Sequence, residues 1–138
     1  MAIVFLGLGS NLGIREQHLL EARNYIQHDI GEIVAESSID ENEASGFAGN
    51  FFCNQVIKIC TELSPENLLQ MTQEIEKKMG RVQKTVIINH VPVYQNRIID
   101  IDILLYDDLQ IDTDLLSIPH PRMYEREFVM KLLIEVKK

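Results

Sequence analysis

Two aspartates alternate with isoleucines near residue 100, and they are the residues of this sequence best suited to chemistry. Asp100 and Asp102 are two positions apart, so on a β-strand they point to the same face, about 6–7 Å apart. The opposite face of that strand would be filled by four apolar side chains, Ile99, Ile101, Ile103 and Leu105. Two carboxylates in an apolar strand are costly to bury unpaired, and Mg²⁺ offsets that cost while also binding substrate phosphates. Because such a pair also occurs on solvated strand faces, its spacing alone leaves metal binding and simple solvation both open.

Cationic side chains that could bind phosphate gather in the second half of the chain. They are Arg81, Lys84, Arg97, Arg122 and Arg126. Each is a surface charge when taken singly, but arginine and lysine beside a pair of aspartates fit a site for a magnesium nucleotide. His120 belongs to the same hypothesis, because the prolines on either side hold it stiffly. Arg122 and Arg126 are four apart, so we expect them to share one face of the last helix or of the segment leading into it.

A glycine-rich segment, Gly7 to Gly13, follows the apolar N-terminal stretch and could suggest a dinucleotide-binding loop. Its third glycine comes one residue too late for the G-x-G-x-x-G pattern, and the segment lacks the lysine of a phosphate-binding P-loop. The regular alternation of strand and helix that accompanies such a loop is also absent from the pattern. The spacing therefore favours a loop that makes a tight turn from a strand into a helix.

The elements that must position these residues follow from apolar periodicity and from turn signals. Strands are expected over residues 2–8, 32–41, 52–63, 98–106 and 109–112, and helices over 15–28, 65–79 and 124–136. Ser64 and Pro65 are typical of a helix start, and Gly80 of a helix end. Residues 41–50 and 81–96 are expected to be loops, the second with some extended structure, and residues 117–121 an extended connection. Adjacent strands imply hairpins, so the order predicts an α+β fold of ferredoxin-like kind, with a mainly antiparallel sheet and helices packed on its faces.

The 138 residues fit one domain, 1–138, and their composition limits the partners of the protein. The net charge of -8 argues against nucleic acid, which requires a basic face. Residues 1–76 hold 3 basic and 12 acidic side chains, whereas residues 77–138 hold 10 and 9, so the half with the aspartate pair can accept a phosphate ligand. No apolar run approaches the roughly 18–20 residues that span a bilayer. Two cysteines and no export signal predict a cytoplasmic protein.

Several short motifs occur in a fixed order along nearly the whole chain. They are Gly9-Ser10-Asn11-Leu12-Gly13, Phe52-Cys53-Asn54, Glu76 ahead of Gly80-Arg81, Arg97-x-x-Asp100-Ile101-Asp102-Ile103, and Ile118-Pro119-His120-Pro121 followed by Arg126 and Phe128. Together they resemble the 6-hydroxymethyl-7,8-dihydropterin pyrophosphokinase family. The resemblance implies an enzyme of folate biosynthesis that transfers pyrophosphate from ATP to the hydroxymethyl group of the pterin and releases AMP.

The resemblance also implies a role for each matching residue. Asp100 and Asp102 would hold two Mg²⁺ ions that bridge the phosphates of ATP, while Asn54 would bind the edge of the pterin. Phe52 and Phe128 would stack on the two faces of the pterin ring. The nucleotide and its phosphates would be contacted by Gln73, Glu76, Arg81, Lys84, Arg97, His120 and Arg126, and catalysis would depend on Arg81, Arg97 and Asp102. The loops 41–50 and 81–96 would close over the substrates, and the partners would be ATP and the pterin, with no nucleic acid and no membrane.

The resemblance is to a divergent and C-terminally short member of the family. Gln83 and Leu115 stand where the family has basic residues, and the first loop has Asn42-Glu43-Ala44-Ser45-Gly46 in place of the family's pattern. These differences keep two alternatives open. One is a catalytically weak or silent ferredoxin-like module that binds a small molecule, and the other is a magnesium–nucleotide transferase with a different acceptor.

Overall fold

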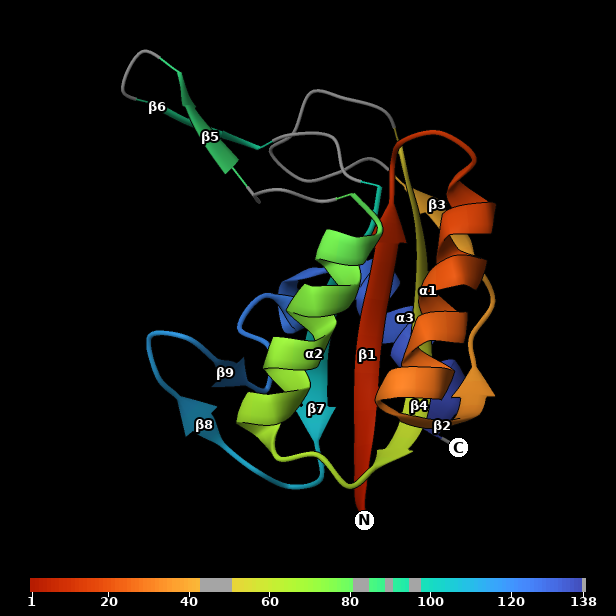
Figure 1. Cartoon of the computed structure of the whole chain (residues 1–138), viewed down its shortest axis with the longest axis vertical. Coiled ribbons are helices and arrows are strands. Elements are labelled where there is room, and N and C mark those ends of the chain that lie inside the picture. The colour runs from red at the N-terminus through yellow and green to blue at the C-terminus, as the bar shows by residue number, and fades with distance from the viewer. Residues whose placement is uncertain (43–50, 81–84, 89–90, 95–97, 138) are drawn as a thin grey trace.

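The structure of the protein is a computed structural model that describes residues 1–42, 51–80, 85–88, 91–94 and 98–137. At its centre is an antiparallel sheet in the order β2-β4-β1-β7, and β3 pairs with the start of β4 (Figure 1). The strands of this sheet are β1 (Ala2–Ser10), β2 (Gly31–Glu36), β3 (Asp40–Asn42), β4 (Phe52–Thr61) and β7 (Asp100–Tyr106). The predicted α+β class with a mainly antiparallel sheet is confirmed.

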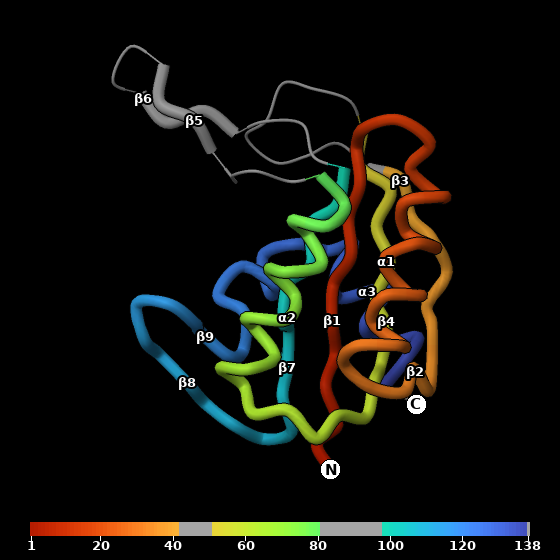
Figure 2. The backbone as a smooth tube through the Cα atoms, viewed as in Figure 1, coloured from red at the N-terminus to blue at the C-terminus, as the bar shows by residue number. Residues whose placement is uncertain are grey.

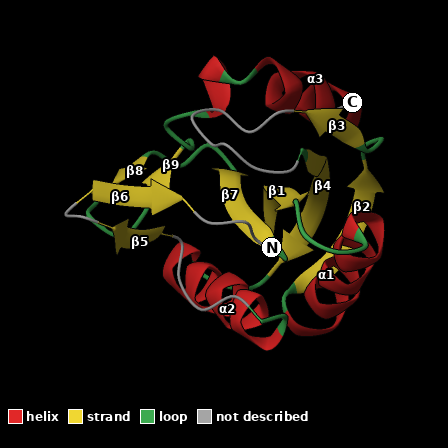
Figure 3. Cartoon of the chain, turned by 90° about the horizontal axis from the view of Figure 1, so that it is seen from above, coloured by secondary structure: helices red, strands yellow, loops and turns green. Residues whose placement is uncertain are grey.

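Helices cover both faces of this sheet. α1 (Arg15–Asp29) and α2 (Pro65–Lys78) lie on one face and α3 (Glu127–Lys137) lies on the other, as the view from above shows (Figure 3). The larger apolar core lies beneath α1 and α2 and includes Leu19, Ile26 and Ile75, and the smaller core beneath α3 includes Leu132 and Leu133. The central strands are therefore buried on both faces, which explains the nearly continuous apolar run of β1.

Two short hairpins form two-stranded sheets of their own, apart from the central sheet. β5 (Thr85–Ile88) pairs with β6 (Val91–Tyr94), and β8 (Ile111–Asp112) pairs with β9 (Ser117–Ile118). The first hairpin is the extended structure that we expected within residues 81–96. In the tube view, the N-terminus and the C-terminal end of α3 lie at one end of the sheet, whereas the end of β1 and the starts of β4 and β7 lie at the other (Figure 2). The predicted site residues of β4 and β7 therefore gather at the same end.

The faces of β7 differ from the prediction at Leu105. The pairing of β7 with β1 runs regularly up to the Leu6–Ile103 pair and then shifts, so that Phe5 pairs with Leu105. This bulge places both Leu104 and Leu105 against the core beneath α3. The isoleucines of β7 do join the core beneath α1 and α2, as predicted. The prediction that Leu105 shares their face is wrong, because it assumed an unbroken two-residue alternation.

The strand predicted over residues 32–41 is interrupted near Ser37. The Ser37 hydroxyl accepts a hydrogen bond from the backbone N–H of Val56 at 2.9 Å, and the Ser37 N–H donates to the Val56 carbonyl, also at 2.9 Å. Because one serine satisfies both backbone groups of Val56, the chain leaves the regular ladder there and pairs again only as β3. The predicted single strand is therefore two strands, β2 and β3.

The ends of α2 agree with the prediction. The Ser64 hydroxyl accepts a hydrogen bond from the N–H of Asn67 at 3.2 Å, and Pro65 occupies the first turn. Gly80, with φ 101°, takes the left-handed conformation just beyond the helix. Within the described residues, no helix combines the length and the apolar character that crossing a bilayer requires.

Candidate active site

Asp100 and Asp102 lie at the start of β7, the strand at one edge of the sheet. Both are partly buried, and they alternate with the buried Ile101, so they share the face of the sheet that α3 covers. Their partners across β1 are Gly9 and Gly7, respectively. No side chain of β1 therefore separates the two carboxylates from β4, the next strand of the sheet.

The prediction that Gly7 and Gly9 lie in a turn is wrong. β1 continues through Ser10, and the left-handed conformation of the turn is taken by Gly13, with φ 65°. A Cβ atom placed on Gly9 would lie 3.0 Å from Asn54 Oδ1 and 3.3 Å from Phe52 Cδ1. The missing side chain at Gly9 thus lets the amide of Asn54 and the ring of Phe52 lie against β1.

Asp100, Gly9 and Asn54 occupy one row across β7, β1 and β4. The register pairs Gly9 with Asp100 on one side and with Asn54 on the other. Adjacent strands are about 4.7–4.9 Å apart, so a carboxylate and an amide are separated by about two strand spacings on one face of the sheet. This separation suits two adjacent ligands, one held at the carboxylates and the other at the amide.

His120 approaches the aspartate pair from the segment that follows β9. Its backbone N–H donates to the carbonyl of Leu104 at 3.0 Å, and its Nδ1 accepts a hydrogen bond from the N–H of Arg122 at 3.2 Å. The neutral imidazole therefore carries its proton on Nε2, which lies 3.9 Å from Asp102 Oδ1. The structure thus brings His120 next to the aspartate pair.

Glu76 is a buried carboxylate on α2 that contacts β7 between the two aspartates. Its Oε2 accepts a hydrogen bond from the backbone N–H of Ile101 at 2.8 Å, and the residue is 5% exposed. Glu76 therefore holds the edge strand from the side that β1 leaves open. The signal in the sequence is a glutamate next to Ile75 on an apolar helix face, because a buried carboxylate requires an internal partner. Gln73, one turn earlier on α2, is exposed.

Replacing Glu76 by leucine is expected to destabilise the protein by about 1–3 kcal/mol, because the N–H of Ile101 loses its acceptor in a buried setting. Glu76→Gln is the matched variant, since its amide oxygen still accepts this hydrogen bond. It should therefore lose less stability than Glu76→Leu. Urea unfolding followed by circular dichroism measures both. Equal free energies of unfolding for Glu76→Leu and the wild type would show that the contact contributes nothing to stability.

The remaining described site residues flank the start of α3. Arg122 and Arg126 lie on either side of a 3₁₀ turn (Met123–Glu125), and α3 begins only at Glu127, because Arg126 is extended, with φ -109° and ψ 101°. The predicted helix start at residue 124 is therefore wrong, and the four-residue spacing does not place the two arginines on one helical face. Arg126 is partly buried and Arg122 is exposed. Phe128 is partly buried against the core beneath α3.

Part of the predicted site lies outside the described residues, namely Arg81, Lys84, Arg97, Gln83 and most of the loop 41–50. Among the residues that are described, no group of three or more His, Cys, Asp or Glu side chains forms a metal site made by protein alone. Two carboxylates are nonetheless a fitting donor set for Mg²⁺, which keeps several water ligands and shares the phosphates of a substrate. Asp100 and Asp102 therefore fit a magnesium site that a nucleotide completes.

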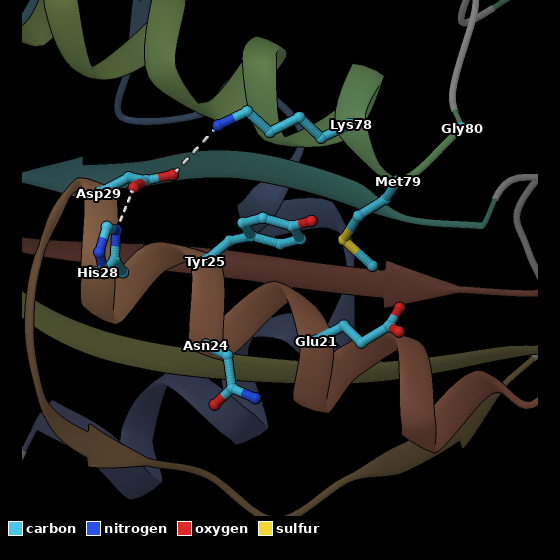
Figure 4. A pocket seen from close by; sticks show the side chains of 8 residues that line it. All are labelled: Glu21, Asn24, Tyr25, His28, Asp29, Lys78, Met79 and Gly80. Atoms are coloured by element: carbon cyan, nitrogen blue, oxygen red, sulfur yellow. Dashed lines mark hydrogen bonds and ion pairs between the residues drawn. The ribbon is translucent and has the colours of Figure 1, made fainter.

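A pocket lies between α1 and the C-terminal end of α2, on the face of the sheet away from the aspartate pair (Figure 4). Its volume is about 830 Å³, and its lining includes Tyr25 and Met79. Lys78 Nζ lies 5.6 Å from the centroid of the Tyr25 ring and 3.5 Å from Asp29 Oδ2. Because Lys78 pairs with a carboxylate of the pocket itself and no predicted site residue lines the pocket, we assign no ligand to it.

Asp29 in this pocket contributes to stability in a pH-dependent way. A 2.6 Å hydrogen bond with His28 holds the pKa of the Asp29 carboxyl below its usual value, against a smaller opposing effect of desolvation, and the nearby Lys78 lowers this pKa further. The contribution is therefore fully present above about pH 4, near the pKa of aspartate in an unfolded chain, and is lost as the pH falls through the lowered pKa. Asp29→Asn should lower the melting temperature slightly at pH 7 and progressively less below pH 4. Calorimetric scans across this pH range measure the difference in melting temperature between Asp29→Asn and the wild type. A difference that stays constant with pH would contradict the prediction.

Comparison with known proteins identifies the class of the protein. A family model described as 7,8-dihydro-6-hydroxymethylpterin-pyrophosphokinase (HPPK) matches residues 5–138. The protein is therefore a pyrophosphokinase, a transferase that moves a diphosphate group. The chain belongs to the 7,8-dihydro-6-hydroxymethylpterin-pyrophosphokinase family, which confirms the resemblance seen in its motifs.

The similar proteins include enzymes that this chain covers over most of their length and a longer protein of which it covers only a part. The 2-amino-4-hydroxy-6-hydroxymethyldihydropteridine pyrophosphokinase of Porphyromonas gingivalis strain W83 is 41% identical over 138 residues, covering 99% of this chain and 91% of the relative. The Bacillus subtilis protein of the same name is 38% identical over 136 residues, covering 97% and 77%. The folic acid synthesis protein FOL1 of Dictyostelium discoideum is 36% identical over 137 residues, covering 97% of this chain but 19% of that protein. These names favour an enzyme of folate synthesis over a silent binding module.

Solved structures show the same fold. A structure described as HPPK-DHPS in complex with substrates has a TM-score of 0.69 at 15% identity, covering 98% of this chain and 40% of that chain. The Plasmodium falciparum HPPK-DHPS structure has a TM-score of 0.59 at 17% identity, covering 98% and 33%. The chain thus spans less than half the length of these two solved chains, and the likeness extends over almost all of its own length.

Proposed function

We propose that the protein transfers pyrophosphate from MgATP to the hydroxymethyl group of 6-hydroxymethyl-7,8-dihydropterin and releases AMP, as a step of folate biosynthesis. The observation that carries this proposal is the row of Asp100, Gly9 and Asn54, which puts a carboxylate pair and an amide on one face of three adjacent strands. The names of the similar enzymes support the same substrate. A cytoplasmic location is part of the proposal, and the two free cysteines, Cys53 and Cys60, support it.

MgATP is assigned to Asp100 and Asp102, with two Mg²⁺ ions. Bound magnesium neutralises phosphate charge and makes the attacked phosphorus more electrophilic. Asp100 and Asp102 would hold the magnesium ions from one face of β7, and His120, whose Nε2 lies 3.9 Å from Asp102 Oδ1, would donate its Nε2–H to a phosphate oxygen. Asp102, or a water molecule held at the same site, is our candidate for accepting the proton of the attacking hydroxyl group.

Cations of the chain stabilise the charge that develops on the transferred group and on the leaving AMP. We assign this role to Arg81 and Arg97, and phosphate binding to Lys84 and Arg126. The family resemblance alone supports the first three, whereas the partly buried position of Arg126 ahead of α3 supports its own role. Gln73 and Glu76 on α2 are assigned to the nucleotide side of the site.

The pterin is assigned to the space beside Gly9. Asn54 offers both a donor and an acceptor to the edge of a heterocycle. Phe52, which lies against Gly9, and Phe128, at the start of α3, supply the aromatic surfaces on which a flat ring stacks. With both substrates held on one face of the sheet, attack of the hydroxymethyl oxygen on the phosphorus is mainly a matter of orientation.

Analysis of the products tests this proposal. Purified protein with ATP, Mg²⁺ and hydroxymethyldihydropterin should form AMP and the pterin diphosphate in equal amounts, and no AMP when the pterin is omitted. Transfer of a single phosphoryl group would form ADP instead. Absence of AMP with retained pterin binding would favour the silent binding module, and AMP formation only with another acceptor would favour a different transferase.

A further inference from the structure

The turn between β1 and α1 contains a sequence motif that the proposed mechanism leaves unused. Ser10 and Asn11 are fully buried, and Gly13 has φ 65°, a conformation that glycine adopts with the least strain. The turn therefore determines where α1 begins, and the first residue of α1 is Arg15. This start of α1 lies at the same end of the molecule as β3 and the start of β4 (Figure 1).

Arg15 connects these two strands. Its NH1 nitrogen donates a hydrogen bond to the carbonyl oxygen of Phe51 at 2.7 Å, and the same nitrogen lies 3.3 Å from Glu41 Oε1. Glu41 belongs to β3, and Phe51 is the residue directly before β4. The Arg15 side chain is 28% exposed and that of Glu41 is 51% exposed, so the ion pair is open to water and the 2.7 Å hydrogen bond to the Phe51 carbonyl is the main contact. One guanidinium group thus holds together the strand ends that flank residues 43–50.

The strand ends that Arg15 holds belong to the candidate pterin site. The register of β3 and β4 places Asp40 opposite Asn54 and Asn42 opposite Phe52. Because Phe51 directly precedes Phe52, a shift of the Phe51 carbonyl is transmitted to the Phe52 ring and along the strand to Asn54. Both side chains lie so close to Gly9 that an added Cβ atom there would meet them at 3.0–3.3 Å. Their placement therefore depends on how firmly the ends of β3 and β4 are held.

We propose that Arg15 is a positioning residue for the pterin, which acts by fixing the ends of β3 and β4 and through them the Asn54 amide and the Phe52 ring. This inference rests on the proposed function, in which those two residues bind the pterin. Arginine suits the role because its planar group can donate to a carbonyl and a carboxylate together, whereas lysine presents one compact charge. The aspartates of β7 are two strands away from β4, so ATP binding should not depend on Arg15.

Substrate-specific kinetics test this inference. Arg15→Met keeps most of the aliphatic stem and removes the charge, so the KM for the pterin should rise about tenfold, as expected for the loss of a charged hydrogen bond. The kcat and the dissociation constant of a non-hydrolysable ATP analogue should stay within about twofold of the wild type, because only the binding of one substrate is affected. The KM of Arg15→Lys for the pterin should lie between the values of the wild type and Arg15→Met. A purely structural role would change the melting temperature and leave the KM for the pterin unchanged.

Arg23→Met is the matched control, because Arg23 lies on the same helix, α1, but contacts side chains of β4 and β2 instead of the strand ends that Arg15 holds. The NH1 of Arg23 is 2.6 Å from Gln55 Oε1, and its Nε is 3.4 Å from Glu36 Oε1. This variant should lose stability to a similar extent and keep the KM for the pterin. An equal rise of this KM in Arg15→Met and Arg23→Met, or no rise in Arg15→Met, would overturn the inference.

A double-mutant cycle with Asn54→Ala separates the inference from the proposed function. If Asn54→Ala leaves pterin binding unchanged, the proposed pterin site itself is wrong. If Asn54→Ala weakens binding and the effect of Arg15→Met adds in full to it, and likewise to the effect of Phe52→Ala, Arg15 acts through neither side chain and the inference alone fails. Losses of pterin-binding free energy that are less than additive support both the proposed pterin site and the inference about Arg15. Arg15→Lys keeps a charge on α1 and replaces the methionine variant in the cycle if that variant does not fold.

Discussion

Replacing Asp102 by asparagine should lower kcat/KM for AMP formation by about a thousandfold, the upper range for removal of one group that stabilises charge in a transition state. Asparagine keeps the shape of the side chain but removes its charge, so the magnesium nucleotide loses one of its two carboxylates on β7. The Mg²⁺ concentration that gives half the maximal rate should rise as well. Initial rates of AMP release over a magnesium titration measure both quantities.

Asp112→Asn is the control for this experiment, because Asp112 also lies on a strand, β8, but is exposed and has no part in the proposed site. Its rates should match those of the wild type. The melting temperature of Asp102→Asn should change little, since Asp102 is partly exposed. Rates for Asp102→Asn close to those of Asp112→Asn would refute the assignment of the aspartate pair.

Valine at Gly9 should weaken pterin binding by about a hundredfold, the scale of loss expected when a bound group is displaced by an ångström. The new Cβ atom would lie 3.0 Å from Asn54 Oδ1 and 3.3 Å from the Phe52 ring, and the two methyl groups of valine would extend further. Both side chains must then move away from β1, so the amide edge and the aromatic surface no longer match one ligand. Calorimetric titration of the pterin in the presence of an ATP analogue measures the loss.

Alanine variants at two positions of the same strand separate this effect from a general weakening of β1. Gly9→Ala adds only the Cβ atom and should weaken pterin binding less than valine does. Gly7→Ala places its Cβ atom 3.5 Å from Leu104, an ordinary contact distance, and should bind the pterin as the wild type does. The proposed placement of the pterin is untenable if Gly7→Ala and Gly9→Ala lose the same affinity.

Local patterns in the sequence are enough to predict most elements and the shared face of the aspartate pair. The two-residue alternation around Asp100 and Asp102 depends only on strand geometry, and Ser64 and Gly80 bound α2 through the preferences of their own backbones. Leu105 marks the limit of this approach. The bulge that turns it toward α3 arises from how β7 packs against β1, and an uninterrupted apolar run contains no sign of it.

Contacts between distant residues could not be predicted in this way. The bond of Glu76 to Ile101 joins residues 25 apart, and it exists because β7 is the edge strand next to α2. The prediction that Gly9 lies in a turn is wrong for a related reason. Gly7 and Gly9 lie within β1 although glycine favours turns and weakens strands, so local preference points away from the conformation that they adopt. Only the register of β1 with its two neighbours shows that Gly9 lies between Asp100 and Asn54.

The position of β7 at the edge of the sheet has one more consequence. β7 pairs with β1 on one side, and on its other side the N–H of Ile101 is bound by Glu76 and the carbonyl of Leu104 by the backbone of His120. Uncovered strand edges are where separate molecules join strand to strand and aggregation begins. Glu76 and His120 occupy these positions on β7. The two contacts that hold β7 beside the candidate site therefore also cover part of its outer edge, so we expect the loss of either one to expose strand edge on which another molecule could pair.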